Sequence, residues 1–277
     1  MRKLLTIAMT FGLAVSTVYS TTVLADAEAD RKAFKDYFVK KFPETDPNDF
    51  INGVYSIDKA SRAQWEEIEE FPPYEIAIDS GESEWNKSFA NGKGYKDCFG
   101  KAGVADQYPQ WDDGKGKVVT LALAINDCRE ANGEKPLKYK KGKMADLLAY
   151  MGYQTRGKKV NVKIPNAKAQ EAYEKGKQFY YARRGQLNMA CAHCHVDNSG
   201  MRIRADLLSP ALGHTTHFPV YRSKWGGMGT LHRRFAGCNK QVRAKPFKAQ
   251  SEEYRNLEYF LTFMSNGLDV NAPGARK

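Results

Sequence analysis

No hydrophobic run of membrane-spanning length occurs in this 277-residue chain after its first residues. The one long apolar run, residues 4–18, follows Arg2 and Lys3 and precedes the small-residue sequence Val23-Leu24-Ala25. A basic start, a short apolar run and a small-residue cleavage site are typical of a secretory signal peptide. We therefore expect residues 1–25 to be removed and the exported protein to have no membrane span.

Acidic residues are scarcer than basic ones, with 32 Asp and Glu against 43 Lys and Arg and a formal net charge of +11. Residues 1–25 contain two basic residues and no acidic residue, so the exported chain keeps a charge of +9. A basic surface often indicates nucleic-acid binding, but an exported protein has little opportunity to meet nucleic acid. The charge favours attraction to acidic protein partners or small anions, although it can also serve solubility alone.

Cysteine is rare, with five in the whole chain, and two of the five form the motif Cys191-x-x-Cys194-His195. C-x-x-C-H is the attachment signature of a c-type haem, in which two thiols bind the porphyrin and the histidine ligates the iron. A zinc site would need a second ligand pair, for which His214 and His217 are poor candidates without a cysteine. A redox dithiol is typical of α/β proteins, and this chain lacks that pattern. We therefore expect covalent haem and, with the signal peptide, a bacterial periplasm.

Hydrophobic residues recur at helical spacing in much of the chain, which predicts a mainly α fold. The segments expected to be helical are 30–42, 58–70, 83–89, 143–151, 167–184 and 251–264. Alternating apolar residues predict an extended linker over 158–165. Glycine inside a helix costs about 1 kcal/mol relative to alanine, so Gly176 predicts a close crossing of segments 167–184 and 251–264. Such a pair of helices resembles the class I cytochrome c fold.

The two halves of the chain repeat a pattern around Cys128 and Cys238. A Thr-Leu pair begins eight residues before each cysteine, and a Lys-Pro pair follows each at the seventh and eighth positions. Collinear matches of this kind indicate an internal duplication. We therefore predict two cytochrome-c-like domains: residues 26–157, without haem and with an N-terminal extension, and residues 158–277, with one haem.

The first repeat has lost its haem motif. If Cys98 corresponds to Cys191, then Lys101 and Ala102 occupy the positions of the second thiol and the proximal histidine. Two cysteines left in an oxidising compartment tend to pair. The repeat therefore predicts a disulfide between Cys98 and Cys128, which would stabilise a domain deprived of its cofactor.

The fifth cysteine, Cys238, is left over in this scheme. A buried inert thiol is one interpretation. However, four fixed cations lie within six positions of it, and such surroundings lower the pKa of a thiol. The loop before the terminal helix of a cytochrome c carries the distal iron ligand, so Cys238 predicts a haem with His and Cys ligands, which makes a poor simple electron carrier.

At these motifs the chain resembles the SoxA family, the cytochrome subunits of SoxAX thiosulfate-oxidising complexes. The resemblance covers residues 30–270 and depends on the sequences at 191–195, 213–222 and 234–239. It implies L-cysteine S-thiosulfotransferase activity, in which thiosulfate is joined oxidatively to a cysteine of the carrier SoxYZ. It also implies that Cys238 is a distal iron ligand modified to a persulfide and that Arg234 contacts substrate.

The resemblance further implies a single-haem member with Cys191 and Cys194 bound to haem c and His195 and Cys238 as axial ligands. The second haem would belong to the partner cytochrome SoxX, and a downstream c-type cytochrome would accept the electrons. Arg234 near the Cys238 sulfur would favour binding of the thiosulfate dianion, because arginine offers paired donors to oxyanions.

Two other functions stay open at this point. A thiosulfate dehydrogenase also uses a haem with His and Cys ligands but makes tetrathionate, usually with two haems. A plain electron-transfer cytochrome would use a methionine as distal ligand, for which Met201, Met228 and Met264 are available. For the histidines outside the iron ligand we expect His193 to be solvated, His214 and His217 to make local hydrogen bonds, and His232 to lie beside the active loop.

Overall fold

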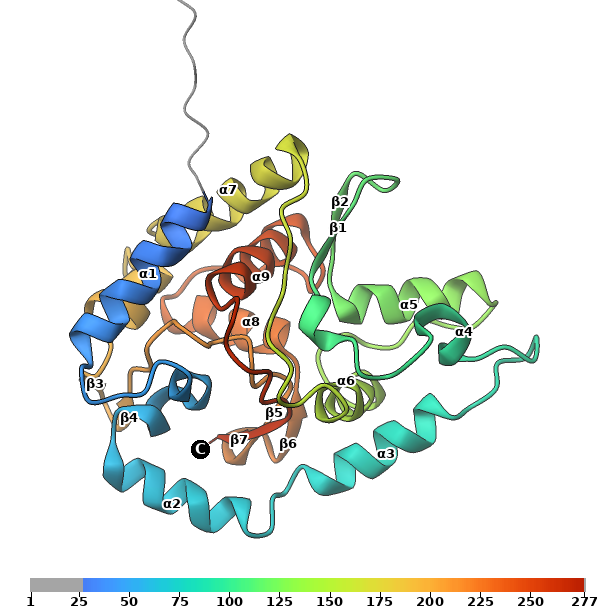
Figure 1. Cartoon of the computed structure of the whole chain (residues 1–277), viewed down its shortest axis with the longest axis horizontal. Coiled ribbons are helices and arrows are strands. Elements are labelled where there is room, and N and C mark those ends of the chain that lie inside the picture. Colours follow the sequence, from blue (N-terminus) through green and yellow to red (C-terminus); the bar gives the residue numbers. More distant parts are fainter. Residues whose placement is uncertain (1–26, 277) are drawn as a thin grey trace, which may run out of the picture.

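The computed structural model describes residues 27–276, and the predicted signal peptide lies outside them (Figure 1). The fold is mainly α, as predicted. Its α-helices are α1 (Ala27–Lys41), α2 (Lys59–Glu69), α3 (Glu75–Trp85), α4 (Tyr95–Phe99), α5 (Leu121–Ala131), α6 (Lys143–Tyr153), α7 (Ala167–Tyr181), α8 (Leu231–Gln241) and α9 (Glu252–Met264). Shorter helical segments are η1 (Asp49–Ser56), η2 (Ala105–Gln107), η3 (His193–Asp197) and η4 (Ser223–Trp225).

Three small sheets complete the structure. Their strands are β1 (Gln110–Asp112), β2 (Lys117–Val119), β3 (Arg202–Ile203), β4 (Asp206–Leu207), β5 (Val220–Arg222), β6 (Gly227–Gly229) and β7 (Gly274–Arg276). β1 pairs with β2 and β3 with β4, both antiparallel. The third sheet has the order β6-β5-β7, so the C-terminal strand lies parallel to β5 in the middle of the molecule (Figure 1). Among the described residues no helix is long and apolar enough to span a bilayer.

The duplication is visible in the element order. β1, β2 and α5 begin at residues 110, 117 and 121, and β5, β6 and α8 begin at residues 220, 227 and 231, an offset of 110 throughout. The strand pairs also share their register, since Gln110 faces Val119 as Val220 faces Gly229. In each half a hairpin therefore leads into an 11-residue helix that carries a cysteine, Cys128 in α5 and Cys238 in α8.

Each half contains a pair of crossed helices whose backbones approach most closely at a glycine. A Cβ atom on Gly176 of α7 would lie 2.0 Å from the carbonyl oxygen of Asn256 in α9, which confirms the predicted crossing. A Cβ atom on Gly81 of α3 would lie 2.1 Å from the carbonyl oxygen of Asp146 in α6. Asp146 and Asn256 differ by the same 110-residue offset. The two helix pairs are therefore equivalent, and glycine is required wherever the backbones approach this closely.

We expect Gly176→Ala to lower the free energy of unfolding by about 3 kcal/mol, because α7 and α9 would have to separate to admit the methyl group. Chemical denaturation of the haem-loaded protein would measure this change. Gln178→Ala, an exposed change on the same helix, should stay within about 0.5 kcal/mol. Equal denaturation midpoints for the two variants would show that the helices do not cross at Gly176.

One helix prediction was wrong. Residues 83–89 were expected to be helical, whereas α3 spans Glu75–Trp85 and residues 86–89 follow it without helical structure. The helix begins directly after the Pro72-Pro73 pair, and its buried side includes Ala77 and Gly81, whose small side chains give little hydrophobic signal. Helices α5 and α8 were not predicted from the spacing at all.

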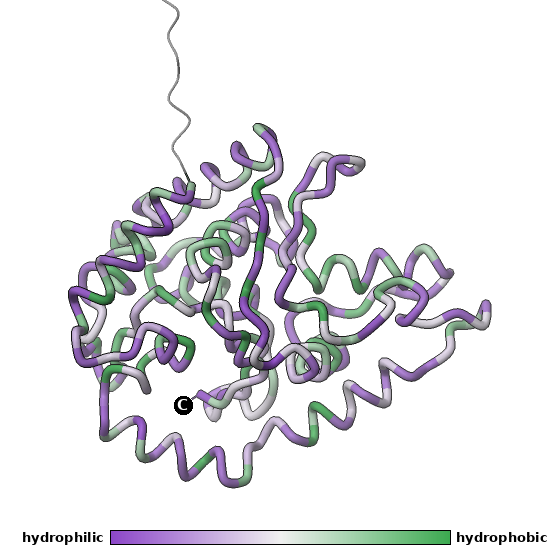
Figure 2. Tube along the Cα trace, in the orientation of Figure 1, coloured by the Kyte–Doolittle hydropathy of each residue, from purple (hydrophilic) through white to green (hydrophobic). Residues whose placement is uncertain are grey.

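The N-terminal extension packs on the second half. Phe34 and Phe38 of α1 and Phe50 of η1 share one core cluster with Tyr173 of α7 and Phe260 of α9. Helix α2 has no buried residue and is mostly hydrophilic along its length (Figure 2). The predicted division after residue 157 stays a prediction, but residues of the extension clearly belong to the haem-side core.

The expected linker, residues 158–165, is extended. Its backbone is hydrogen-bonded to the segment that follows α9. The Val160 N–H donates to the carbonyl oxygen of Leu268 at 2.9 Å, and the Gly267 N–H donates to the carbonyl oxygen of Val160 at 3.0 Å. The segment therefore runs between the halves as part of their boundary.

Candidate functional site

The motif histidine is oriented by a backbone carbonyl. His195 lies in η3, and its Nδ1 is 2.9 Å from the carbonyl oxygen of Ser209. A carbonyl oxygen only accepts, so Nδ1 carries the proton and Nε2 keeps its lone pair free for a metal. His193, expected to be solvated, is half-buried instead, and its Nδ1 accepts a hydrogen bond from the Ala190 N–H at 2.8 Å.

The fifth cysteine lies against this histidine. Cys238 is half-buried in the middle of α8, so the expectation of a loop position was wrong. Burial raises the pKa of the Cys238 thiol, but Arg234, His195 and Arg222 outweigh burial and lower the pKa to about 7. The structure therefore brings Cys238, His195 and two arginines together at one place and favours a thiolate there.

Arg234 is the cation near Cys238 in sequence that acts most strongly on its sulfur. It lies one helical turn before Cys238 on the same face of α8. The guanidinium of Arg233 instead lies 4.3 Å from the centre of the Trp225 ring and donates to the carbonyl oxygen of Met228. Adjacent arginines of the motif therefore have different surroundings.

The second arginine was missed as a site residue. Arg222 ends strand β5, whose partner β6 leads into α8. Burial and the nearby charge of Arg234 lower the pKa of Arg222, which shows that the two guanidinium groups lie close together. Arg222 belongs to the 213–222 motif that carried the family resemblance, but nothing in its local sequence placed it beside Cys238.

The remaining histidines bind their neighbours, as expected for two of them. His214 Nε2 lies 2.7 Å from Ser209 Oγ, and its ring packs edge-on against His195 at 4.4 Å between centres. His217 Nδ1 lies 3.0 Å from the carbonyl oxygen of Ile51, which only accepts, so Nδ1 carries the proton. His214 and Ser209 therefore both contact His195 and help to fix the orientation of its ring.

Two of the three candidate methionine ligands lie away from the motif. Met228 is buried in a separate cluster with Tyr74 and Ala145, and Met201 is 61% exposed beside β3. Met264 is buried in the core cluster that also contains Tyr180 and Phe235. Cys238 is the sulfur that lies against His195.

The residues present at the site fit haem c. Cys191 and Cys194 supply two thiols at the attachment spacing, His195 supplies Nε2 as a ligand for iron, and Cys238, whose sulfur is hydrogen-bonded to His195 here, supplies a candidate second ligand. Buried aromatic residues such as Tyr180 and Phe235 provide apolar surroundings in the same core cluster. Among residues 27–276, no group of three or more His, Cys, Asp or Glu side chains is arranged to hold a metal ion by itself.

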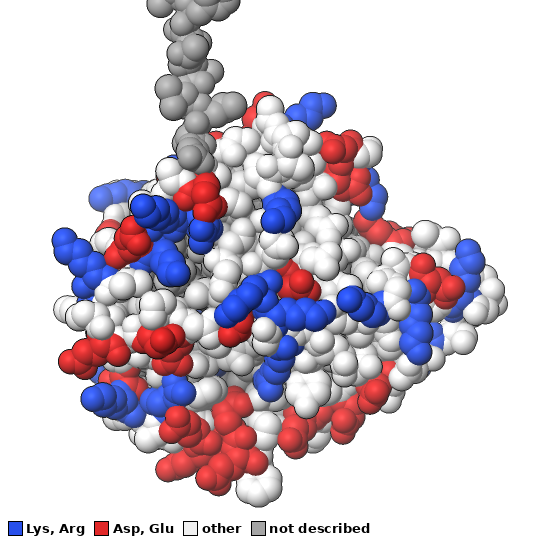
Figure 3. All heavy atoms as spheres, viewed as in Figure 1, with Lys and Arg blue, Asp and Glu red and all other residues white. Residues whose placement is uncertain are grey.

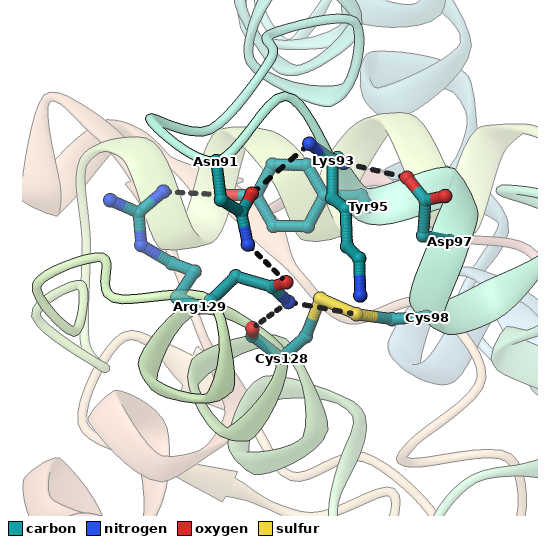
Figure 4. Close-up of a disulfide and its surroundings, with 9 residues drawn as sticks. Asn91, Lys93, Tyr95, Asp97, Cys98, Cys128 and Arg129 are labelled. Atoms are coloured by element: carbon teal, nitrogen blue, oxygen red, sulfur yellow. Dashed lines mark hydrogen bonds between the residues drawn. A yellow bond between two sulfur atoms is a disulfide. The ribbon is translucent and has the colours of Figure 1, made fainter.

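In the other half, a disulfide stands at the equivalent place. Cys98 of α4 and Cys128 of α5 are joined (Figure 4). The Asn132 side chain donates to the carbonyl oxygen of Cys128 and contacts the Cys98 sulfur. Cys128 corresponds to Cys238 by the 110-residue offset. If Cys98 corresponds to Cys191, as predicted, the disulfide links the counterparts of Cys191 and Cys238.

We expect Cys98→Ser with Cys128→Ser to lower the free energy of unfolding by about 3–4 kcal/mol, because the disulfide closes a loop of about thirty residues in the unfolded chain. Denaturation of the oxidised protein and of the double variant would measure it. Either wild-type cysteine found as a free thiol in unreduced peptide maps would contradict the predicted pairing.

Charge is distributed unevenly over the surface. Residues 63–86 hold eight of the 32 acidic residues and no Lys or Arg. Figure 3 shows acidic side chains gathered over α2 and α3. The excess of positive charge therefore lies on the rest of the molecule, which includes Arg222 and Arg234 beside Cys238.

Comparison with known proteins agrees with this geometry. The family model "SoxA/TsdA, cytochrome c domain" matches residues 80–160 and 175–270. The chain is 60% identical over 257 residues to the L-cysteine S-thiosulfotransferase subunit SoxA of Allochromatium vinosum, covering 91% of each chain. It is 55% identical over 251 residues to the subunit of the same name from Chlorobaculum tepidum, covering 90% of this chain and 88% of that one. The crystal structure of SoxXA from P. pantotrophus matches with a TM-score of 0.71 and 35% identity, over 78% of this chain and 84% of that one.

Proposed function

This chain belongs to the SoxA family, and on that premise we propose which residues carry its chemistry. It is an L-cysteine S-thiosulfotransferase subunit with cytochrome-c-like domains and haem c. The observation that carries the assignment of residues is the position of Cys238, which lies against His195 with Arg234 and Arg222 beside its sulfur.

The protein binds a single haem in its second half. Cys191 and Cys194 would hold it covalently, and His195 and Cys238 would bind its iron. When bound, the haem takes up and passes on one electron at a time. The first half has a disulfide at the equivalent place, which supports a count of one.

The reaction joins thiosulfate to a cysteine of the SoxYZ carrier. A bond forms between the sulfane sulfur of thiosulfate and the sulfur of the carrier thiol, one proton leaves that thiol, and two electrons are removed. Arg234 and Arg222 bind the thiosulfate dianion and hold its sulfane sulfur toward Cys238. Cys238, carried as a persulfide, is the protein sulfur that takes part in the exchange.

The electrons leave to SoxX, the cytochrome subunit that forms a complex with this one, and then to a downstream c-type cytochrome. The structural match to SoxXA from P. pantotrophus supports a SoxX partner. The signal-peptide pattern of residues 1–25 and the c-type haem motif support a location in the periplasm.

The test is turnover of thiosulfate by the haem-loaded complex with SoxX, together with SoxYZ and an electron acceptor. We expect thiosulfate to become attached to the carrier cysteine, detected by the intact mass of SoxYZ. Tetrathionate as the main product would indicate a thiosulfate dehydrogenase instead. Electron transfer without any sulfur product would indicate a plain cytochrome.

A further inference from the structure

Two side-chain contacts of the same kind join the halves of the protein. In one, the Thr230 hydroxyl donates to the carbonyl oxygen of Tyr139 at 2.9 Å, and the Thr230 N–H donates to that of Lys140 at 3.2 Å. In the other, the Thr120 hydroxyl donates to Gln250 Oε1 at 2.9 Å. Thr120 corresponds to Thr230, and Lys140 to Gln250, by the 110-residue offset. The contacts are therefore counterparts in a pseudo-symmetric boundary.

The two threonines differ in what their hydroxyls do. Both precede a helix as its N-cap residue, and Thr120 accepts a hydrogen bond from the Leu123 N–H in the ordinary way. Thr230 makes no such bond to α8, the helix that contains Cys238. The start of α8 is therefore fixed by the haem-less half, through Tyr139 and Lys140, in place of a side-chain cap of its own.

The contact between Thr120 and Gln250 is extended by further polar contacts within the second half. The Gln250 N–H donates to His232 Nδ1 at 3.0 Å, so Nδ1 carries no proton. His232 Nε2 lies 3.0 Å from Glu258 Oε2, and His232 is only 2% exposed. A chain of hydrogen bonds thus runs from Thr120 at the start of α5, through Gln250, to His232 of α8. Glu258 of α9 lies close to His232 without a hydrogen bond to it.

These contacts lie on the buried side of α8. Asn239, seven residues after His232 and on the same stripe, donates to the Tyr254 hydroxyl at 2.7 Å. A cavity of about 90 Å³ lies at the boundary and is lined by residues of both halves, including Leu121, His232 and Glu258. The lining is mainly apolar but includes the polar side chains of Thr230, His232 and Glu258. Close packing is incomplete at this cavity, so side-chain hydrogen bonds help to fix α8 there.

We propose that the haem-less half positions α8, and with it Cys238, through these two contacts, with Thr230, Gln250 and His232 as the positioning residues. The inference rests on the proposed function, in which Cys238 is an iron ligand and the reacting sulfur. Both roles need the sulfur held to a fraction of an ångström, which a helix fixed at its N-terminus and along its buried side provides. The haem-less first half would thereby keep a role in placing Cys238, although it has lost its own haem motif.

The test uses Thr230→Val and Gln250→Met in the haem-loaded complex with SoxX. Each removes one contact across the boundary, and neither removes the helix cap at Thr120. We expect amide hydrogen exchange in residues 231–241 to become about tenfold faster in each variant, as for the loss of one buried hydrogen bond. The paramagnetic resonance spectrum of the ferric haem should also broaden, because the Cys238 sulfur is less uniformly placed. Thr230→Ser, which keeps the hydroxyl, should restore both properties.

Thr155→Val is the matched control, because the Thr155 hydroxyl is buried but donates within the first half, to the carbonyl oxygen of Met151 at 2.7 Å. It should leave α8 exchange and the spectrum unchanged. Wild-type exchange in both test variants, or equal acceleration in Thr155→Val, would overturn the positioning role; if Thr230→Val does not fold, Gln250→Met decides. A wild-type spectrum without thiolate ligation would instead contradict the proposed function.

Discussion

Replacing Cys238 by methionine is expected to abolish the conjugation of thiosulfate to the carrier cysteine while leaving the protein folded. Methionine is a competent iron ligand in cytochromes c, so the coordination position can still be filled. Its sulfur is capped by a methyl group and cannot exchange with thiosulfate or with the carrier. The two roles assigned to Cys238 are thereby separated. The measurement is thiosulfate turnover with SoxX, SoxYZ and an electron acceptor present.

The visible spectrum of the Cys238→Met variant serves as its control, since a six-coordinate haem shows that the site is intact. A related control is Met228→Leu, which changes a buried methionine in the separate cluster with Tyr74 and should keep wild-type turnover. Substantial residual turnover in Cys238→Met would mean that the chemistry occurs at another sulfur and would favour the plain electron-transfer alternative.

The second large effect is expected for Arg234→Ala. Loss of one charge-assisted contact to the substrate, of roughly 1.5–3 kcal/mol, should lower kcat/KM for thiosulfate by about 10- to 150-fold. Arg234→Lys should restore only part of the loss, because an ammonium group lacks the paired planar donors of a guanidinium. Steady-state kinetics at fixed ionic strength would measure both variants.

Arg233→Ala is the matched control for Arg234→Ala. Arg233 is adjacent in sequence and equally charged, but its guanidinium lies on the Trp225 ring, away from the sulfur. We expect it to retain kcat/KM within about threefold, since it removes only long-range charge. An unchanged kcat/KM in Arg234→Ala with an intact haem spectrum, or equal losses in both variants, would remove Arg234 from the substrate site.

Much of the haem-side architecture follows from local patterns in the sequence. Gly176 predicted the crossing of α7 and α9 because glycine inside an otherwise strong helix needs a reason, and the close approach to Asn256 is that reason. The disulfide was inferred from an internal comparison, in which Cys128 corresponds to Cys238 and Cys98 to Cys191, and it is present. In both cases the relevant information lies within a short segment or in a direct repeat.

What the sequence did not reveal depends on contacts between distant segments. Cys238 was expected on a loop because a cytochrome c carries its distal iron ligand in the loop before the terminal helix. The helix α8 that contains Cys238 was not predicted, since it is rich in basic residues and its buried side includes only a few hydrophobic residues. Arg222 reaches the site only because β5 pairs with β6, and the bonds of Thr230 and Gln250 across the boundary join residues far apart in the chain. No periodicity in one segment encodes such pairings.

The most direct test of the central claim is the paramagnetic resonance spectrum of the ferric haem in wild-type protein and in Cys238→Met, recorded side by side. Cys238 as distal ligand predicts a low-spin signal typical of thiolate ligation in the wild type, replaced in the variant by a signal typical of His and Met ligands. The same spectrum in both proteins would show that the Cys238 sulfur is not bound to iron and would contradict the account.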